Sequence, residues 1–452
     1  MDPLTSPLLT DLYEINMVQA YLDSGETKTA VFEFFVRKLP PRRGFFIAAG
    51  LHQVLDCLEN LRFSPEEIAW LAQTGRFSKD LLDYLSGFRF SGDVHAMAEG
   101  QIFFPNEPIL RITAPMPEAQ FVETRIINIL HYQTLIASKA ARMILAGPGR
   151  QMVDFGLRRA HGADAGLMAA RAAFIAGFAG SATLLAEHDF GIPAYGTMAH
   201  SFIEAFDNEN IAFESFAKAC PGKLTLLIDT YDTEVAARRL VKLAPRLSAQ
   251  GFHIDAVRLD SGDLIALARS VRGILDDGGL NDVAIFVSGG LDEDDVARIM
   301  EAGAPIDGFG IGTSLTTSSD APALDCAYKL QEYAGLPRRK RSAGKATWPG
   351  RKQIWRRYDG AGRMSGDIVS LDMDAHEGEP LIDCVMKNGR RIAEPPSLRQ
   401  IRERAARDLA RLPEPLASLD PAGAYPVEIA GLLRQAADEV DRRVAQMKET
   451  MP

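Results

Sequence analysis

The pattern of apolar and polar positions predicts a mixed α+β region from the N-terminus to about Pro117. Apolar residues recur at helical spacing after Thr10 and Asp11, either of which is a suitable N-cap, and Gly25 ends this helix. Residues 30–36 are rich in β-forming side chains and predict a strand. The other elements expected here are short helices at residues 50–61 and 64–74 and strands between residues 88 and 113.

From residue 118 to 145 the pattern is that of one long helix, which ends at Gly147-Pro148-Gly149. Beyond Arg150 it changes to a repeated strand, turn and helix. Because each strand-and-helix unit spans about 30 residues, we predict a parallel sheet, either open or closed into a barrel. Strands are expected at residues 151–155, 192–195, 224–228, 254–259, 283–287 and 306–309, and helices at residues 163–178 and from Thr233, Asp263 and Asp292.

After about residue 335 this rhythm ends. Strand-like pieces at residues 343–357 and 368–386 are followed by helical patterns at residues 397–412 and 427–447. A chain of 452 residues also exceeds what one hydrophobic core usually organises. We therefore expect an N-terminal α+β domain with its linking helix (1–147), an α/β barrel with the active site (148–335), and a C-terminal segment that returns to the first domain and adds a helical cap (336–452).

Composition narrows the class of protein. The formal net charge of −10 argues against a general nucleic-acid binder, which needs a basic surface. The apolar window 166–186 contains Arg171 and many small residues, so we expect a buried helix and a strand there and no membrane span. The 4 cysteines form no Cys-x-x-Cys pair, which favours reduced thiols without a structural metal. Together with an N-terminus that lacks a signal-peptide pattern, these features predict a cytoplasmic protein.

Polar residues and glycines follow each of the expected strands. The carboxyl ends of parallel strands meet at one edge of a sheet, where ligand sites form. One such cluster is commonly a turn or a helix cap, but an uninterrupted series favours an active site. In chain order the candidates are Asp154, Phe155, Gly156, Arg158, Arg159, Thr197, His200, Ser201, Asp229, Asp232, Arg258, Asp260, Ser261, Asp263, Ser288, Gly289, Gly290, Gly310, Gly312 and Thr313.

The side chains and backbone groups of these clusters are suited to bind an anionic, sugar-like ligand. The glycines at 288–290 and 310–313 expose backbone N–H groups that suit a phosphate, although each could be only a tight turn. Asp260 and Asp263 could hold sugar hydroxyls or a hydrated Mg²⁺, and Asp263 could equally be only a helix-terminal charge. Arg158 and Arg159 offer a fork for a carboxylate or phosphate, unless one is a surface arginine.

Two further features are open to more than one interpretation. His200 beside Ser201 at a helix start would, alone, be a buried histidine and a cap, but its neighbours at the other strand ends favour a role in the site. The basic run 337–345 is either a solvated loop or a loop that faces a polyphosphate.

Seven short segments together resemble the nicotinate phosphoribosyltransferase family. They are residues 9–17, 154–159, 196–201, 229–233, 258–263, 287–290 and 308–315, in the family's order and at fitting intervals. Each is weak alone, but jointly they are specific, and the likeness extends from about residue 9 to residue 357. The resemblance implies an irregular, TIM-like parallel α/β barrel of the quinolinate phosphoribosyltransferase type, with an N-terminal α+β domain and a C-terminal helical extension, in a homodimer with shared active sites.

The resemblance also implies a reaction. Nicotinate and 5-phosphoribosyl 1-diphosphate (PRPP) would form nicotinate mononucleotide and diphosphate, with coupled ATP hydrolysis and with Mg²⁺ carried by the diphosphate, near Asp263. Phe155 would stack on the nicotinate ring, Tyr13 of the partner subunit would cover its other face, and Arg158 would bind its carboxylate. His200 would carry a phosphate with Asp229 as its orienting partner, and Asp260 would be catalytic. The ribose and 5-phosphate would contact Arg258, Asp260, Ser288, Gly289, Gly290, Gly312 and Thr313.

Other functions were weighed against this one. The nearest is a nicotinamide phosphoribosyltransferase, in whose family an aspartate falls near residues 180–183. Here those residues are Gly180-Ser181-Ala182-Thr183, whereas the nicotinate enzymes tend to have Gly-Thr-Ser-Asn. A catalytically silent dimeric scaffold of the same fold would lack some strand-end residue, and none is missing. An aldolase-type barrel would need a Schiff-base lysine at a strand end, and the strand ends contain none.

Overall fold

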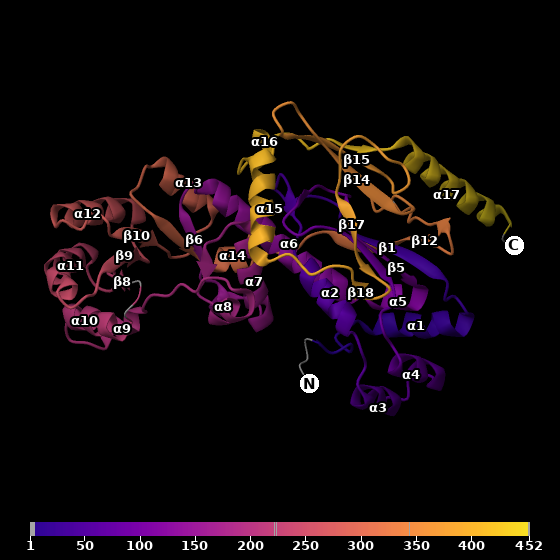
Figure 1. Cartoon of the computed structure of the whole chain (residues 1–452), viewed down its shortest axis with the longest axis horizontal. Coiled ribbons are helices and arrows are strands. Elements are labelled where there is room, and N and C mark those ends of the chain that lie inside the picture. Colours follow the sequence, from indigo (N-terminus) through magenta and orange to yellow (C-terminus); the bar gives the residue numbers. More distant parts are fainter. Residues whose placement is uncertain (1–4, 221, 223, 343, 451–452) are drawn as a thin grey trace. The chain divides into compact units, whose positions relative to one another are not determined.

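The computed structural model describes residues 5–220, 222, 224–342 and 344–450, and the chain divides into two compact units (Figure 1). Unit 1 combines Met1–Leu135 with Ala323–Pro452, and unit 2 is Ile136–Pro322. Both units combine helices with β-sheets. Nowhere in the described part of the chain does a helix have the length and apolarity needed to cross a bilayer.

Unit 2 is built on a parallel six-stranded sheet, as the sequence predicts. The strand order is β7-β6-β11-β10-β9-β8, and every neighbouring pair is parallel. Among the described residues no ladder joins β7 to β8, so hydrogen bonds do not close the sheet into a barrel. The strands are β6 (Gln151–Asp154), β7 (Gly180–Ser181), β8 (Leu224–Leu227), β9 (Ile254–Leu259), β10 (Ala284–Val287) and β11 (Gly308–Ile311).

Two predicted strands of this unit need correction. Residues 192–195 form no strand, since their one ladder contact is an isolated bridge between Ser181 and Ala194. Gly180–Ser181 forms the edge strand β7 in their place, although glycine is a poor strand former. The last strand, expected at residues 306–309, lies at Gly308–Ile311, because Gly308 and Phe309 pair with Gln151 and Met152 of β6.

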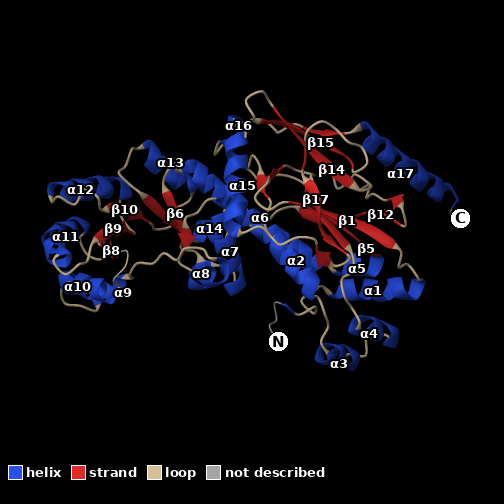
Figure 2. Ribbon diagram, viewed as in Figure 1, coloured by secondary structure: helices blue, strands red, loops and turns tan. Residues whose placement is uncertain are grey.

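The helices of unit 2 begin where their polar caps predict. Asp232, Asp263 and Asp292 each accept backbone N–H groups at the start of α11, α12 and α13. Figure 2 shows α11 and α12 beside the strands β8 to β10. The helices are α7 (Ala163–Ala176), α8 (Leu184–Phe190), α9 (His200–Glu204), α10 (Glu209–Ala219), α11 (Thr233–Ser248), α12 (Leu264–Asp277), α13 (Glu293–Glu301) and α14 (Thr313–Thr316), with the single-turn η2 (Leu157–Arg159).

Unit 1 contains a seven-stranded antiparallel sheet in the order β13-β12-β1-β5-β3-β17-β18. Strands from the C-terminal part flank the three N-terminal strands on both sides, because β12 pairs with β1 and β17 pairs with β3. A four-stranded sheet, β16-β14-β15-β19, and the pair β2-β4 complete the unit. The strands are β1 (Thr29–Val36), β2 (Phe46–Ile47), β3 (Asp93–Met97), β4 (Ile102–Phe103), β5 (Pro108–Pro115), β12 (Cys326–Tyr333), β13 (Leu336–Pro337), β14 (Lys352–Tyr358), β15 (Met364–Leu371), β16 (Glu379–Pro380), β17 (Ile382–Lys387), β18 (Arg390–Arg391) and β19 (Val427–Ile429).

The helices of unit 1 follow the predicted pattern with two differences. Ser64 forms the predicted cap of α3, but neither Thr10 nor Asp11 caps α1 with its side chain. The helix expected from residue 427 starts only at Gly431, because Val427–Ile429 pairs with β15 instead. The helices are α1 (Leu12–Ser24), α2 (Leu51–Asn60), α3 (Pro65–Gln73), α4 (Lys79–Ser86), α5 (Met116–Phe121), α15 (Leu398–Arg411), α16 (Glu414–Ala417) and α17 (Gly431–Thr450), and the helix α6 (Glu123–Ala146) has residues in both units.

Buried charges are paired inside the core of unit 1. Arg356 of β14 is 1% exposed and forms an ion pair of 2.6 Å with Asp367 of β15. Lys352 forms another, of 2.6 Å, with Glu33 of β1. Since an unpaired buried charge costs several kcal/mol, these pairs make the C-terminal strands a required part of the core of unit 1.

Candidate active site

The polar residues that follow the strands of unit 2 lie at the carboxyl edge of its sheet. Asp154 is the last residue of β6, Asp260 directly follows β9, Ser288 directly follows β10, and Gly312 directly follows β11. The strands are parallel and adjacent, so these residues come from neighbouring chain segments at one edge. Asp229 follows β8 at the end of the same row.

Arg258 of β9 connects most of these residues. Its Nε donates to Ser288 Oγ over 2.8 Å, and its Nη1 donates to Thr197 Oγ1 over 3.1 Å. Its Nη2 lies 2.6 Å from Asp260 Oδ1. The guanidinium carbon lies 5.5 Å from the centroid of the Phe155 ring, within the range of a cation–π contact. One side chain thus joins an aromatic surface, a carboxylate and two hydroxyls.

Asp260 is held as a carboxylate. Burial alone would raise its pKa, but the hydrogen bond from Ser288 and the positive charge and hydrogen bond of Arg258 outweigh burial and lower its pKa. Ser288 Oγ donates to the same oxygen, Oδ1, that Arg258 contacts. The second oxygen, Oδ2, lies 3.9 Å from His200 Nε2. The site therefore holds a fixed negative charge that could stabilise a cationic reaction centre.

His200 is the first residue of α9, and its hydrogen-bond partner differs from the predicted one. Its Nδ1 lies 3.2 Å from Thr230 Oγ1, and its side chain is 41% exposed. The prediction that Asp229 orients the imidazole needs correction, because Asp229 Oδ2 accepts instead from Asp260 N over 2.8 Å and from Ser261 Oγ over 2.7 Å. Asp229 Oδ1 is buried and has no hydrogen-bond partner among the residues that the structure describes. In this structure Asp229 fixes the loop that carries Asp260.

The glycine turn after β10 is packed against the same loop. Gly289 has a φ of 112°, and a Cβ there would lie 2.2 Å from the carbonyl oxygen of Asp260. Gly290 also has a positive φ, 73°, but a Cβ there would meet no atom within 4 Å. After β11, a Cβ on Gly310 would lie 2.4 Å from the Phe155 ring. Gly289 and Gly310 therefore allow close packing that a side chain would prevent. The backbone at Gly290 lies in open space.

Arg158 and Arg159 lie in η2, directly after Phe155 and Gly156. Both are exposed, and neither guanidinium makes a hydrogen bond or an ion pair with the residues that the structure describes. Two adjacent cations with free donors are suited to a carboxylate or a phosphate.

Asp154 fixes the segment that connects β6 to η2. It is 1% exposed, its Oδ1 accepts from Gly156 N over 2.8 Å, and its Oδ2 accepts from Ser181 Oγ over 2.7 Å. Burial raises the pKa of Asp154 to about 6, although both hydrogen bonds lower it. Ser181, in the stretch that departs from the resembled family, thus supports the loop that follows β6.

Some candidates do not join this group. Asp232 and Asp263 are helix N-caps, and one oxygen of Asp263 accepts from Ile265 N and Ala266 N. Ser201 contributes no side-chain hydrogen bond among the described residues. Tyr13 lies on α1 of unit 1 and is 45% exposed. The basic run 337–345 is also in unit 1, where Arg341 lies 3.2 Å from Asp441, so part of its charge is paired.

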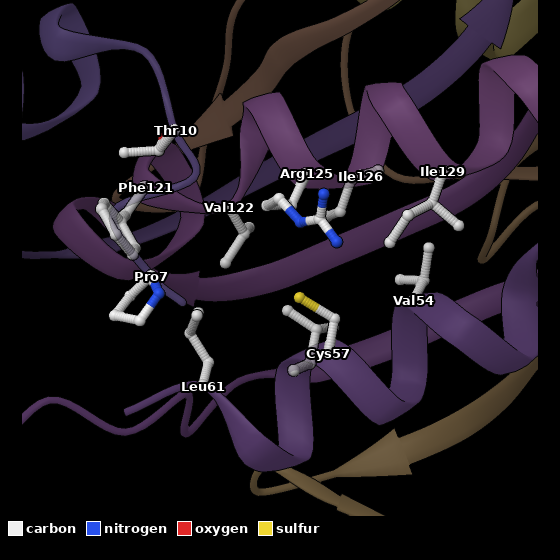
Figure 3. Close-up of a pocket in the computed structure, with 11 residues that line it drawn as sticks. Pro7, Thr10, Val54, Cys57, Leu61, Phe121, Val122, Arg125, Ile126 and Ile129 are labelled. Carbon is white, nitrogen blue, oxygen red and sulfur yellow. The ribbon is translucent and has the colours of Figure 1, made fainter. Parts of the chain in front are cut away.

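A cavity of about 540 Å³ opens beside the connected residues. Phe155, Thr197, Arg258, Ser288 and Gly310 line one part of it, and Gln151, Tyr195 and Thr225 line another. This volume suits a small substrate. By contrast, the pocket in unit 1 between α2 and α6 (Figure 3), where Cys57 and Arg125 face each other, has a volume of about 10 Å³ and has room for a water molecule at most.

The sequence does not single out Thr230, which lies between Asp229 and Asp232, and it gives the candidate Thr197 no specific role. Their signal, a hydroxyl just after a strand, also occurs in ordinary turns, so only the contacts to His200 and Arg258 distinguish them.

Three models of one family match the chain in order. The nicotinate phosphoribosyltransferase (NAPRTase) N-terminal domain matches residues 8–131, the NAPRTase family model matches residues 150–334, and the nicotinate phosphoribosyltransferase C-terminal domain matches residues 370–436.

Individual proteins agree with the family models. A nicotinate phosphoribosyltransferase of Mycobacterium tuberculosis is 48% identical over 425 residues, which cover 94% of this chain and 91% of the relative. The Bacillus subtilis enzyme of the same name is 37% identical over 376 residues, covering 80% of this chain and 76% of the relative. Among solved structures, human nicotinic acid phosphoribosyltransferase superposes with a TM-score of 0.85 at 26% identity, covering 96% of this chain and 100% of that one.

Proposed function

The chain belongs to the nicotinate phosphoribosyltransferase family, and from this premise we propose that it joins nicotinate to PRPP, forming nicotinate mononucleotide and diphosphate. The observation that carries the proposal is the group formed by Arg258, Asp260, Ser288 and Phe155 at the carboxyl edge of the unit 2 sheet. It combines a surface for an aromatic ring with a fixed carboxylate beside it.

The nicotinate ring would stack on Phe155. Arg158 would pair with its carboxylate, and the absence of any competing acid beside Arg158 among the described residues supports this role. Tyr13 of the partner subunit would cover the opposite face of the ring, which requires a homodimer with shared sites. The exposure of Tyr13, 45%, leaves its ring available for such a contact.

The ribose and the 5-phosphate would lie along β9, β10 and β11. Arg258 and Asp260 would contact the ribose, while Ser288, Gly289, Gly290, Gly312 and Thr313 would hold the 5-phosphate. When diphosphate leaves, positive charge develops on the ribosyl carbon, and the carboxylate of Asp260 would stabilise it. The low pKa of Asp260 supports this role, because the group stays charged at neutral pH.

ATP would act through His200 as a phosphohistidine. A phosphate at this position would add negative charge beside Asp260 and reorganise the diphosphate site. Mg²⁺ would neutralise the diphosphate. The ion would bind through the substrate diphosphate, near Asp263.

We also propose the wider organisation that the family implies. The unit 2 sheet would be an irregular barrel of the quinolinate phosphoribosyltransferase type. The whole chain would consist of three parts, residues 1–147, 148–335 and 336–452. The bridge between Ser181 and Ala194 supports the barrel, because it extends the sheet by one more parallel segment. The 4 free cysteines support a cytoplasmic location, where thiols stay reduced.

The test is a product assay with PRPP and Mg²⁺, run with nicotinate or nicotinamide and with or without ATP. We expect nicotinate mononucleotide, a rate that ATP increases, and little product from the amide. A preference for nicotinamide would overturn the choice of substrate. The absence of any nucleotide product would overturn the enzymatic function.

A further inference from the structure

The two ring nitrogens of His200 lie in different surroundings. Nδ1 lies 3.2 Å from the hydroxyl of Thr230, close enough for a hydrogen bond. Nε2 lies 3.9 Å from Asp260 Oδ2, which is too far for one. Because the Thr230 oxygen lies within hydrogen-bonding distance of Nδ1, Nε2 is the nitrogen left to bond a phosphorus atom. The choice of nitrogen is therefore made by a residue that follows β8.

We propose that Thr230 is the positioning residue for the phosphate-accepting histidine, an inference that rests on the proposed function. Its Oγ1 accepts the Nδ1–H of His200 and so keeps the proton off Nε2. A neutral imidazole then presents the Nε2 lone pair to ATP. Thr230 takes the place that we had predicted for Asp229, whose Oδ2 is committed to Asp260 N and Ser261 Oγ.

The lack of charge on the hydroxyl matters for this role. A carboxylate on Nδ1 would stabilise the imidazolium form, which has no lone pair to donate. A hydroxyl that accepts from Nδ1–H places the proton on Nδ1 without that stabilisation. Asp260 Oδ2, at 3.9 Å, then faces the ring as it becomes positive during the transfer.

The transfer balances as follows. The Nε2 lone pair forms a bond to the γ-phosphorus of ATP. The bond from that phosphorus to the bridging oxygen breaks, and its electron pair leaves with ADP. The Nδ1 proton stays on the ring and continues to donate to Thr230 Oγ1.

The experiment compares Thr230→Val, which has a similar shape without the hydroxyl, with Thr230→Ser, which keeps the hydroxyl. Thr233→Val is the matched control, because Thr233 lies three residues further along the chain, as the first residue of α11, and its side chain makes no hydrogen bond with the described residues. The measurement is the rate at which labelled γ-phosphate of ATP appears as acid-labile, base-stable protein phosphate. We expect Thr230→Val to be slower by about 10-fold or more, and Thr230→Ser to stay within about 3-fold of the natural protein.

A spectroscopic measurement separates positioning from loss of structure. With ¹⁵N-labelled histidine, and His200→Gln to assign the signal, the natural protein should show the Nδ1–H tautomer at His200. Thr230→Val should show a mixture of tautomers, and Thr233→Val should match the natural protein in both measurements.

Three outcomes would overturn the inference: Thr230→Val phosphorylated at the natural rate, Thr230→Ser as slow as Thr230→Val, or an Nε2–H tautomer in the natural protein. Failure of the proposed function looks different. In that case the natural protein itself would form no nicotinate mononucleotide from nicotinate and PRPP.

Discussion

At the scale of single residues, Arg258 is the side chain on which the site depends most. Its three hydrogen-bonding groups are each committed to a different partner, Ser288, Thr197 and Asp260. Lysine has one ammonium group and cannot reproduce a planar fork with three fixed directions.

We therefore predict that Arg258→Lys lowers kcat/KM for PRPP by about 10²-fold or more, with the fold retained. Steady-state kinetics and a thermal melt would measure the two properties. Arg246→Lys is the control, since Arg246 pairs only with Glu214 at the surface in the described structure, 69% exposed. Retention of activity within about 3-fold in Arg258→Lys would contradict the role given to the guanidinium.

Asp154 leads to a prediction about pH and stability. Its pKa is about 6 in the folded protein against an ordinary value of 3.8, so the folded state binds the proton more tightly than the unfolded state. Protonated Asp154 therefore contributes up to roughly 3 kcal/mol to the free energy of unfolding. This contribution is fully present below about pH 4 and is lost as the pH rises through about 6.

Asp154→Asn resembles the protonated form and should lack this dependence. We therefore expect the difference in melting temperature, variant minus natural protein, to be more positive at pH 7.5 than at pH 4.5. The same difference between the two proteins at both pH values would show that Asp154 does not titrate in this range.

His200 itself carries the third prediction at this scale. We expect His200→Ala to keep the fold, because the side chain is 41% exposed, and to lose the stimulation by ATP. The ratio of rates with and without ATP should fall to about one. If acid-labile phosphate still appears on this variant after ATP treatment, the phosphorylated residue lies elsewhere.

The sequence is most informative about charged residues and glycines that follow strands. Carboxylates, arginines and glycines that follow strands stood out, and the structure places Asp154, Arg258, Asp260 and Ser288 at one edge of the sheet. It could not show that Thr230, and not Asp229, contacts His200. That choice depends on side-chain geometry within about an ångström, which no local pattern encodes.

At the scale of secondary-structure elements, the turns after the strands limit what the site can accept. Gly289 has almost no room for a side chain, because a Cβ would lie 2.2 Å from Asp260 O, whereas Gly290 has open space around it. Both have positive φ, so alanine is strained at either position by about 1 kcal/mol. Only at Gly289 does a backbone collision follow as well.

We predict that Gly289→Ala displaces the Asp260 loop and lowers kcat/KM for PRPP by about 10²-fold, while Gly290→Ala lowers it by about 10-fold or less. Kinetics with PRPP varied at saturating nicotinate would measure both. An equal loss in the two variants would show that strain alone, and not the contact with Asp260, determines the effect.

Elements with strong local signals were predicted well. The starts of α3, α11, α12 and α13 lie within one residue of the expected helix starts at residue 64, Thr233, Asp263 and Asp292, because a serine or aspartate at a helix start is a local signal. The expected strand at residues 192–195 was wrong, because the sheet takes Gly180–Ser181 as its edge and leaves Ala194 with a single bridge. Pairing of that kind depends on neighbouring strands and not on local propensity.

At the scale of the whole molecule, unit 1 is built from both ends of the chain. Strand β17 pairs with β3, and β12 pairs with β1, so the seven-stranded sheet is complete only when the C-terminal part is present. The sequence indicated a change of rhythm near residue 335, but the pairing of strands so far apart has no local signal.

We predict that a chain ending at Pro380 loses order in unit 1 and keeps it in unit 2. Removal of β17 exposes the edge of β3, and removal of Asp408 and Tyr425 takes away buried groups that Arg356 and Asp367 contact. Hydrogen exchange should become faster in β3 and β5 and stay slow in β9 and β10. Equal acceleration in both sheets would show that the two units depend on each other for stability.

Because unit 1 is divided between the two ends of the chain, its sheet can be completed only late in synthesis. Residues 93–97 of β3 leave the ribosome long before residues 382–387 of β17, with about 285 residues between them. At about 5–20 residues per second, the wait is roughly 15–60 s. Unit 2, which is continuous, can fold during that interval, while the edge of β3 that later pairs with β17 stays open and invites aggregation. A nascent chain of this protein is therefore expected to need a chaperone more for its first 135 residues than for the part that contains the candidate active site.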